Sequence, residues 1–206
     1  TVQVSYNASL SAKKITITGS IEPKTAADSL LWNLSLTTTG SSDDDTISVG
    51  SDTGAEISIG TADKLFKDIT LTTTNQNITF GENCKLHAAG TISAIGKNVT
   101  FNNSIISNAL VVNAEEEVSL NGLNAKSFTV TGTTTTPTAV KYAGLIKLYG
   151  TSDFIIDYPA ITTDNVEFEL GGNFVLQDKT TPYTREGSIV PDVDYNSATP
   201  RTLKIT

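Results

Sequence analysis

Few residues of this 206-residue sequence are suited to nucleophilic or acid–base chemistry. Cys84 and His87 lie three positions apart, and His87 is the only histidine, so a histidine-based metal cluster is excluded. A thiol–imidazole pair acts as a nucleophile only when the two groups touch and a third group orients the base. On nearby positions of a β segment we expect an inward thiol and a surface imidazole. The sequence therefore predicts no Cys–His nucleophile.

Carboxylate pairs are the second source of possible chemistry. Glycoside hydrolysis needs two carboxyl groups at a set separation inside a cleft. Asp153 with Asp157, and Glu167 with Glu169, lie on expected strands, and Glu167 and Glu169 should share one face. No Lys or Arg cluster accompanies these acids, and an acid-rich face would repel acidic polysaccharides. A polysaccharide-active enzyme remains an alternative, but we predict no catalytic residue.

Two acidic runs are candidates for binding a cation. Asp43–Asp45 lacks the ligand spacing of an EF-hand loop, and the Gly-rich calcium nonapeptide is absent. Glu115–Glu117 separates two expected strands, so we expect it to be a corner that faces water. We predict that the chain needs no metal and no other cofactor.

The charge of the chain restricts its partners. The formal net charge is −8 and the pI is near 4.6, so nucleic acid and anionic membranes are disfavoured. One cysteine permits no disulfide within the chain, and no apolar run has the length of a membrane-spanning helix. The chain starts at Thr1 without an initiator Met or a signal sequence, so we expect a processed product or an excised fragment.

The elements that must position these groups are short strands. Apolar and polar residues alternate almost throughout, as in Ile15–Ile17, Ile47–Val49, Ile57–Ile59 and Val166–Leu170. Ser and Thr supply 52 of the 206 residues, and they suit solvated β faces better than helix interiors. Only 26–32 has helical character, and this stretch is too short to form an independent helix. The sequence predicts an all-β chain.

A repeat sets the expected architecture. The pattern polar, branched apolar, hydroxyl, large apolar occurs at 77–80 and 98–101 and again, in related form, at 117–120. Repeats of about 20 residues are typical of stacked units, so we expect a parallel β-solenoid. Its core should hold one column of Ile78, Val99 and Val118 and another of Phe80, Phe101 and Leu120. A β-sandwich is the alternative, although it does not predict a fixed shift.

Three regions are expected along the chain. Residues 61–178 should form the solenoid core. Residues 1–60 contain strands but do not keep the register, so we expect an irregular β segment or a cap. Residues 179–206 carry several prolines and should form an arm or linker, and Thr133–Thr138 should protrude as a loop.

Residues 68–132 resemble secreted bacterial β-helix adhesins of the filamentous haemagglutinin type and the passengers of autotransporters. The likeness is carried by repeats of about 20 residues with Gly, Asn, Ala and alternating Val, Ile and Leu. Phe80-Gly81-Glu82-Asn83, followed by Ala88-Ala89-Gly90, is also similar to repeats of chlamydial polymorphic outer-membrane proteins. The resemblance implies a right-handed parallel β-helix, export, and binding or scaffold work without catalysis.

These observations favour a non-catalytic segment of a bacterial adhesin or structural protein that is secreted or exposed at the cell surface. We expect its lateral face and loops to bind a host glycan or protein surface. A subunit that self-assembles into a surface layer or fibre is an alternative, as is the polysaccharide-active enzyme. We expect no nucleic acid partner and no membrane insertion by this segment.

Overall fold

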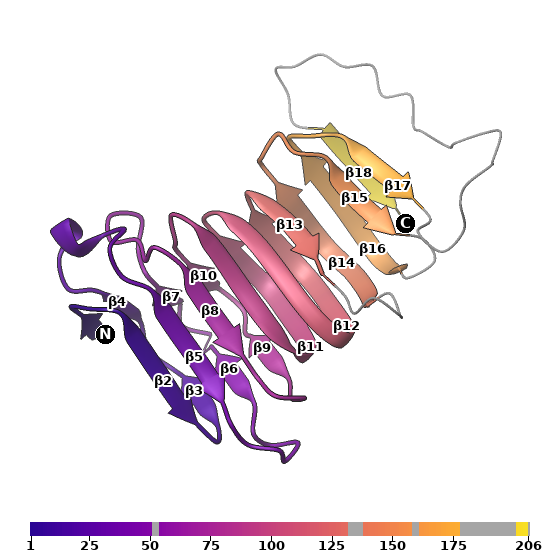
Figure 1. Cartoon of the computed structure of the whole chain (residues 1–206). Helices are drawn as coiled ribbons and strands as arrows, with labels where there is room; N and C mark the ends of the chain where they lie inside the picture. The colour runs from indigo at the N-terminus through magenta and orange to yellow at the C-terminus, as the bar shows by residue number, and fades with distance from the viewer. Residues whose placement is uncertain (51–53, 132–137, 158–160, 178–200, 206) are drawn as a thin grey trace.

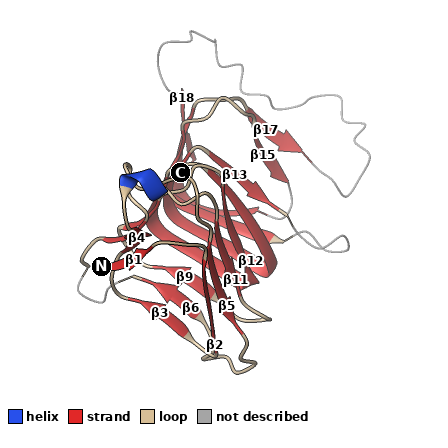
Figure 2. Cartoon of the chain, turned by 60° about the vertical axis from the view of Figure 1, so that its left-hand side comes forward, coloured by secondary structure: helices blue, strands red, loops and turns tan. Residues whose placement is uncertain are grey.

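The computed structural model describes residues 1–50, 54–131, 138–157, 161–177 and 201–205. Within these ranges the chain is a parallel β-solenoid of about seven turns, with strands stacked along one axis from the N-terminal to the C-terminal end (Figure 1). The only helical segment described is one 3₁₀ turn, η1 (Ala26–Asp28), at a corner near the N-terminal end (Figure 2). The predicted all-β solenoid is confirmed, and the sandwich alternative is excluded by the parallel pairing.

The strands form three flat sides, which we call faces A, B and C. Face A contains β2 (Ala8–Ala12), β5 (Leu34–Thr38), β8 (Ile69–Thr72), the first parts of β11 (Thr91–Ile106) and β12 (Ala109–Ala125), and β13 (Ser127–Val130). Face B contains β3 (Ile15–Ile17), β6 (Ile47–Val49), β9 (Ile78–Phe80), the middle of β11 and β12, and the first halves of β14 (Ala139–Leu148) and β16 (Ile161–Leu170). Face C contains β1 (Val2–Val4), β4 (Ile21–Pro23), β7 (Ile57–Ile59), β10 (Cys84–Leu86) and the last parts of β11, β12, β14 and β16. β15 (Phe154–Asp157) and β17 (Phe174–Gln177) pair with each other in a separate parallel sheet.

The core consists of continuous apolar columns, one inward residue per coil. Val99 is paired with Ile78 on one side and Val118 on the other, and all three are fully buried. Phe101 is likewise paired with Phe80 and Leu120, and the two phenylalanine rings stack 4.5 Å apart at an interplanar angle of 8°. Both predicted columns are therefore confirmed. A single coil could not bury these side chains, but successive coils cover one another.

The corner between faces B and C depends on left-handed backbone. Asn83, Asn103, Gly122 and Gly144 all have φ between 49° and 88° and occupy this corner in successive coils. Glycine and asparagine adopt this conformation at lower cost than other residues. The corner thus turns the chain from face B to face C, and the register of the paired strands shifts there, between Asn121 and Leu123 and between Ala143 and Gly144.

The N-terminal segment, 1–60, belongs to the same stack. Leu34 pairs with Ile69 on face A, and Ile47 pairs with Ile78 on face B, so the pairing crosses the expected boundary at residue 60 without interruption. The register is hidden in the sequence because these coils are longer. The coil that leads from Ile47 to Ile78 contains more residues than the coil that leads from Ile78 to Val99, and the additional residues lie between strands.

The C-terminal region is only partly described. Residues 178–200, most of the expected arm or linker, lie outside the described ranges, and β18 (Arg201–Ile205) pairs antiparallel with β16. Most of the expected loop at Thr133–Thr138 also lies outside the described residues. Thr138 itself is buried, and its hydroxyl donates to the carbonyl oxygen of Ala114 at 2.7 Å.

Candidate interaction surface

The thiol and the imidazole do not form a pair. Cys84 points into the core, is fully buried, and donates to the carbonyl oxygen of Val49 at 2.9 Å. Burial raises the pKa of Cys84 to about 11, which keeps the thiol protonated at neutral pH. His87 follows the end of β10 and is half-buried. Burial first, and then the charge of Lys85, lower the pKa of His87, with Glu56 opposing them.

Of the two candidate acid pairs, the structure describes both side chains only for Glu167 and Glu169. Glu167 and Glu169 share the outer side of β16, as predicted, but Glu169 is bound to Lys147 at 2.9 Å. Asp153 accepts a hydrogen bond from Asn173 at 2.8 Å, beside β15 and β17. The side chain of Asp157 lies outside the described residues. The carboxylate of Glu169 is therefore engaged in an ion pair with the lysine of the adjacent strand β14.

Residues of both acidic runs bind other groups of the same chain. Asp45 accepts a hydrogen bond from the backbone N–H of Ser42 at 2.9 Å, which closes the loop on itself. Glu116 and Glu117 lie at the corner between faces A and B and pair with Lys97 at 3.4 Å and Lys141 at 2.7 Å. Among the described residues no three His, Cys, Asp or Glu side chains converge as a metal site.

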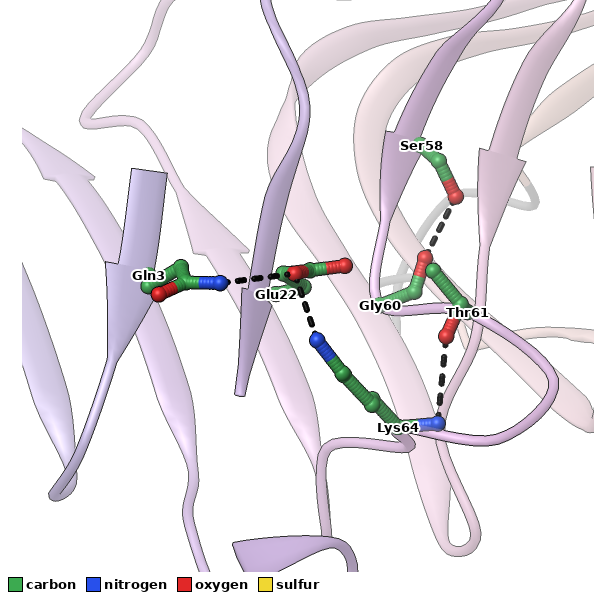
Figure 3. Close-up of polar contacts among 6 residues, drawn as sticks. All are labelled: Gln3, Glu22, Ser58, Gly60, Thr61 and Lys64. Atoms are coloured by element: carbon green, nitrogen blue, oxygen red, sulfur yellow. Dashed lines mark hydrogen bonds and ion pairs between the residues drawn. The ribbon is translucent and has the colours of Figure 1, made fainter. Parts of the chain in front are cut away.

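Corners and face C carry polar groups that already bind one another. Glu22 accepts hydrogen bonds from Gln3 at 3.2 Å and from Lys64 at 2.7 Å, so one carboxylate ties three parts of the chain together (Figure 3). These two donors, the lysine first, lower the pKa of Glu22. Ser58 donates to the carbonyl of Gly60 beside this cluster. Such groups hold adjacent coils in register and have little capacity left for a ligand.

Faces A and B both carry outward neutral hydroxyls, but face B has one column of them, Thr16, Ser48, Thr79 and Thr100, whereas face A has two columns side by side. On face A, one column runs through the first four coils, Ser9, Ser35, Thr70 and Ser93. The second column, Ser11, Thr37 and Thr72, runs through three coils, and Ile95 occupies its position in the fourth. None of these hydroxyls bonds to another described residue, and all are at least partly exposed. Strand geometry spaces them about 4.8 Å apart between coils and about 6.8 Å apart along a strand.

An aromatic pair borders this array. Tyr6 and Trp32 occupy equivalent corner positions before β2 and β5, and their ring centroids are 5.4 Å apart at 56°. Between them and the strands, the side chain of Asn7 accepts from the backbone N–H of Asn33 at 2.8 Å, which locks the two corners together. Tyr6 is 73% exposed. Trp32 is half-buried against the core with its indole nitrogen enclosed, so Tyr6 is the exposed ring of the pair beside the first hydroxyls of face A.

Trp32 and the tyrosines are dispersed in the sequence, so the 20-residue repeat does not predict that Tyr6 and Trp32 lie together. A second repeat, with a spacing longer than about 20 residues, indicates that these two corners are equivalent. Residues 6–11 read Tyr-Asn-Ala-Ser-Leu-Ser, and residues 32–37 read Trp-Asn-Leu-Ser-Leu-Thr, which is the same order of aromatic, amide, apolar and hydroxyl residues.

A flat array of hydroxyl groups can form several hydrogen bonds with one extended ligand. Each hydroxyl can both donate and accept, so the columns can bind several hydroxyls of an extended polymer, directly or through water. An aromatic ring adds an apolar contact with a polar edge. No charged side chain lies in the two columns, so the hydroxyls themselves favour neither an anionic nor a cationic ligand.

No helix in the described part of the chain has the length and apolar character to cross a membrane. The chain matches no family model, no curated protein and no solved structure.

Proposed function

We propose that this chain is a non-catalytic segment of a bacterial β-solenoid adhesin, secreted or exposed at the cell surface, and that it binds neutral glycans along face A. The observation that carries the proposal is the double column of unbonded hydroxyls beside Tyr6 and Trp32. The resemblance of residues 68–132 to secreted bacterial adhesins supports the biological setting.

Charge supports a neutral ligand over an acidic one. The chain carries a net charge of −8, so a polymer rich in carboxylate or sulfate would be repelled at low ionic strength. A neutral polysaccharide pays no such cost and presents hydroxyls at regular intervals. Each direct hydrogen bond contributes only about 0.5–1.5 kcal/mol, so useful affinity depends on several contacts in a row and on many copies of the protein.

The experiment is a glycan array probed with the labelled chain, followed by titration of any glycan bound. Replacing both Thr70 and Thr72 by Val removes two hydroxyls of face A while keeping the shape of the side chains. Two lost hydrogen bonds predict about a tenfold weaker binding. The matched control replaces Thr79 and Thr100 by Val on face B, and it should bind like the unmodified chain.

Three outcomes would contradict the proposal. These are binding only to polyanions, equal losses from the face A and face B variants, and turnover of a polysaccharide. Turnover would favour the enzyme alternative, and capture of a protein ligand without any glycan would move the function to protein recognition.

A further inference from the structure

The free hydroxyls of face A form a grid with regular spacing in two directions. On β2, β5 and β8, which lie side by side, the strands repeat the order hydroxyl, leucine, hydroxyl (Figure 1). Pairing in register sets the grid spacing at about 4.8 Å along the solenoid axis and about 6.8 Å along each strand. This hydroxyl grid consists of Ser9, Ser11, Ser35, Thr37, Thr70, Thr72 and Ser93.

The hydroxyl grid has a rigid support. Leu36 and Leu71, which alternate with the hydroxyls, are fully buried, and so are Leu34 and Ile69 at the starts of the same strands. Parallel backbone pairing fixes the distance between the strands. The threonines of the grid are branched at Cβ, so their side chains have few rotamers. A ligand that matches the grid therefore orders few protein groups when it binds.

The other faces of the described structure differ in kind. The outward hydroxyls of face B form a single column, which repeats in one direction only. Face C carries charged groups, including the ion pairs Lys85–Glu56 and Lys147–Glu169. An ammonium group is strongly hydrated and organises water around itself. Among the described residues, face A is therefore the surface with neutral donors and acceptors at fixed spacings in two directions.

A two-dimensional grid is complementary to a crystal face. A single polymer chain follows one direction, whereas a crystal face repeats in two directions and can contact all the hydroxyls of the grid at once. Ice is a neutral crystal in which every molecule donates and accepts hydrogen bonds, as a hydroxyl does. On the prism faces of ice, the oxygen atoms repeat in two perpendicular directions with periods close to those of the grid.

We propose that the hydroxyl grid of face A binds the prism faces of ice. Water molecules that bridge neighbouring hydroxyls take up positions of the outermost ice layer, so the chain joins the crystal through its own ordered water. Adsorbed chains then hinder the advance of the ice front between them. This activity uses the same face as the proposed glycan binding, but it goes beyond that function and does not depend on it.

The extent of the grid sets the strength of binding. Ile95 follows Thr72 in one column, and Val111 follows Ser93 in the other, so apolar side chains interrupt both columns. Ile95 is 38% exposed and therefore lies at the surface beside the last hydroxyls. Because the grid spans only four coils, we expect weak adsorption that slows the coarsening of small ice crystals at micromolar concentrations.

The first test is ice recrystallisation in thin frozen films that contain the unmodified chain at about 1–100 μM. Crystals should stay small above a threshold concentration. Thr70→Lys places a long, strongly hydrated side chain inside the grid and should raise that threshold at least about tenfold. The matched control is Thr79→Lys, which adds the same charge on the outer side of β9 in face B. It should behave like the unmodified chain.

Adsorption to a single ice crystal tests the crystal plane. The chain is labelled sparsely with a fluorophore on its lysines, none of which belongs to the hydroxyl grid, and a single crystal is grown in its presence. Fluorescence should mark the prism planes, and Thr70→Lys should leave them dark. Circular dichroism just above the freezing point shows whether each variant is folded. If Thr70→Lys does not fold, the planes marked by the unmodified chain decide the question.

The possible outcomes separate ice binding from glycan binding. The inference is overturned if the unmodified chain neither slows recrystallisation nor marks a prism plane, or if it marks only the basal plane. Equal thresholds for the Thr70→Lys and Thr79→Lys variants also overturn it. A chain that binds a glycan but not ice keeps the proposed function and loses only this inference, whereas ice binding without glycan binding refutes the proposed function alone.

Discussion

Replacing Val99 by Asp should destabilise the chain far more than the same change at Thr100. Val99 is fully buried between Ile78 and Val118, whereas Thr100 is the next residue of the same strand and points outward. Losing a buried valine costs about 2 kcal/mol, and enclosing a carboxyl group without a partner costs about 1–3 kcal/mol more. We expect a loss of about 3–5 kcal/mol for Val99→Asp and at most about 1 kcal/mol for Thr100→Asp.

The effect should depend on pH, because the core favours the neutral carboxyl and raises the pKa of the new aspartate. Below about pH 3.9 the acid is protonated in both the folded and unfolded states, so only the packing and polar costs remain. As pH rises above that value, the unfolded chain ionises first. The cost then grows by up to about 1.4 kcal/mol per pH unit until the folded pKa is reached.

Urea unfolding followed by circular dichroism, at pH 3.5 and pH 7, measures the loss of unfolding free energy in each variant and its dependence on pH. In a chain of this size the loss of about 3–5 kcal/mol expected at pH 3.5 corresponds to a fall in Tm of about 10 °C, and the fall should be larger at pH 7. Equal midpoints for Val99→Asp and Thr100→Asp, or a cost at position 99 that shrinks as pH rises, would refute the stacked core as the source of stability.

Further predictions concern the Cys84 thiol, the acidic run Asp43–Asp45 and the Glu22 carboxylate. Cys84 should react with a thiol reagent at pH 8 only as fast as the chain unfolds, since its pKa is about 11 and its sulfur is enclosed; fast labelling of the native protein would contradict this. Chelator treatment should leave Tm unchanged, and a rise in Tm on adding calcium would instead assign a site to Asp43–Asp45. The pKa of Glu22 is lowered in the folded state, so its contribution is present above its ordinary value of 4.5 and is lost as pH falls through the folded pKa. Glu22→Gln should therefore flatten the acid limb of the stability curve, and an unchanged limb would show that the Lys64 contact is not formed in solution.

The fold could be predicted from the middle of the chain because the coils there have few residues between strands. Ile78, Val99 and Val118 recur at nearly equal intervals of about 20 residues, and each falls on the same column. The same column continues back to Ile47 and Ile15, but those coils are longer and no single shift aligns them. Core columns depend on strand register, which residues added between strands do not change. The alternation of apolar and polar residues within each strand therefore predicts the core positions better than the length of the repeat does.

The surface was harder to predict than the core. The residue types in the sequence are enough to predict the apolar columns. They do not show whether the hydroxyl of an outward serine or threonine is already hydrogen-bonded within the chain. The structure separates Ser119, which donates to Glu117, from Thr70 and Thr72, which have no partner among the described residues. The proximity of Tyr6 and Trp32 also required the pairing of β2 with β5, which brings together corners that are distant in the sequence.

NMR mapping of a bound glycan decides whether face A is the binding surface. The glycan with the strongest signal on the array is titrated into isotopically labelled chain. We expect shift changes at Thr70, Thr72 and Ser93 and at the ring protons of Tyr6, with face B residues Thr79 and Thr100 unchanged. Shift changes confined to faces B and C, or no binding of any glycan, would contradict the claim.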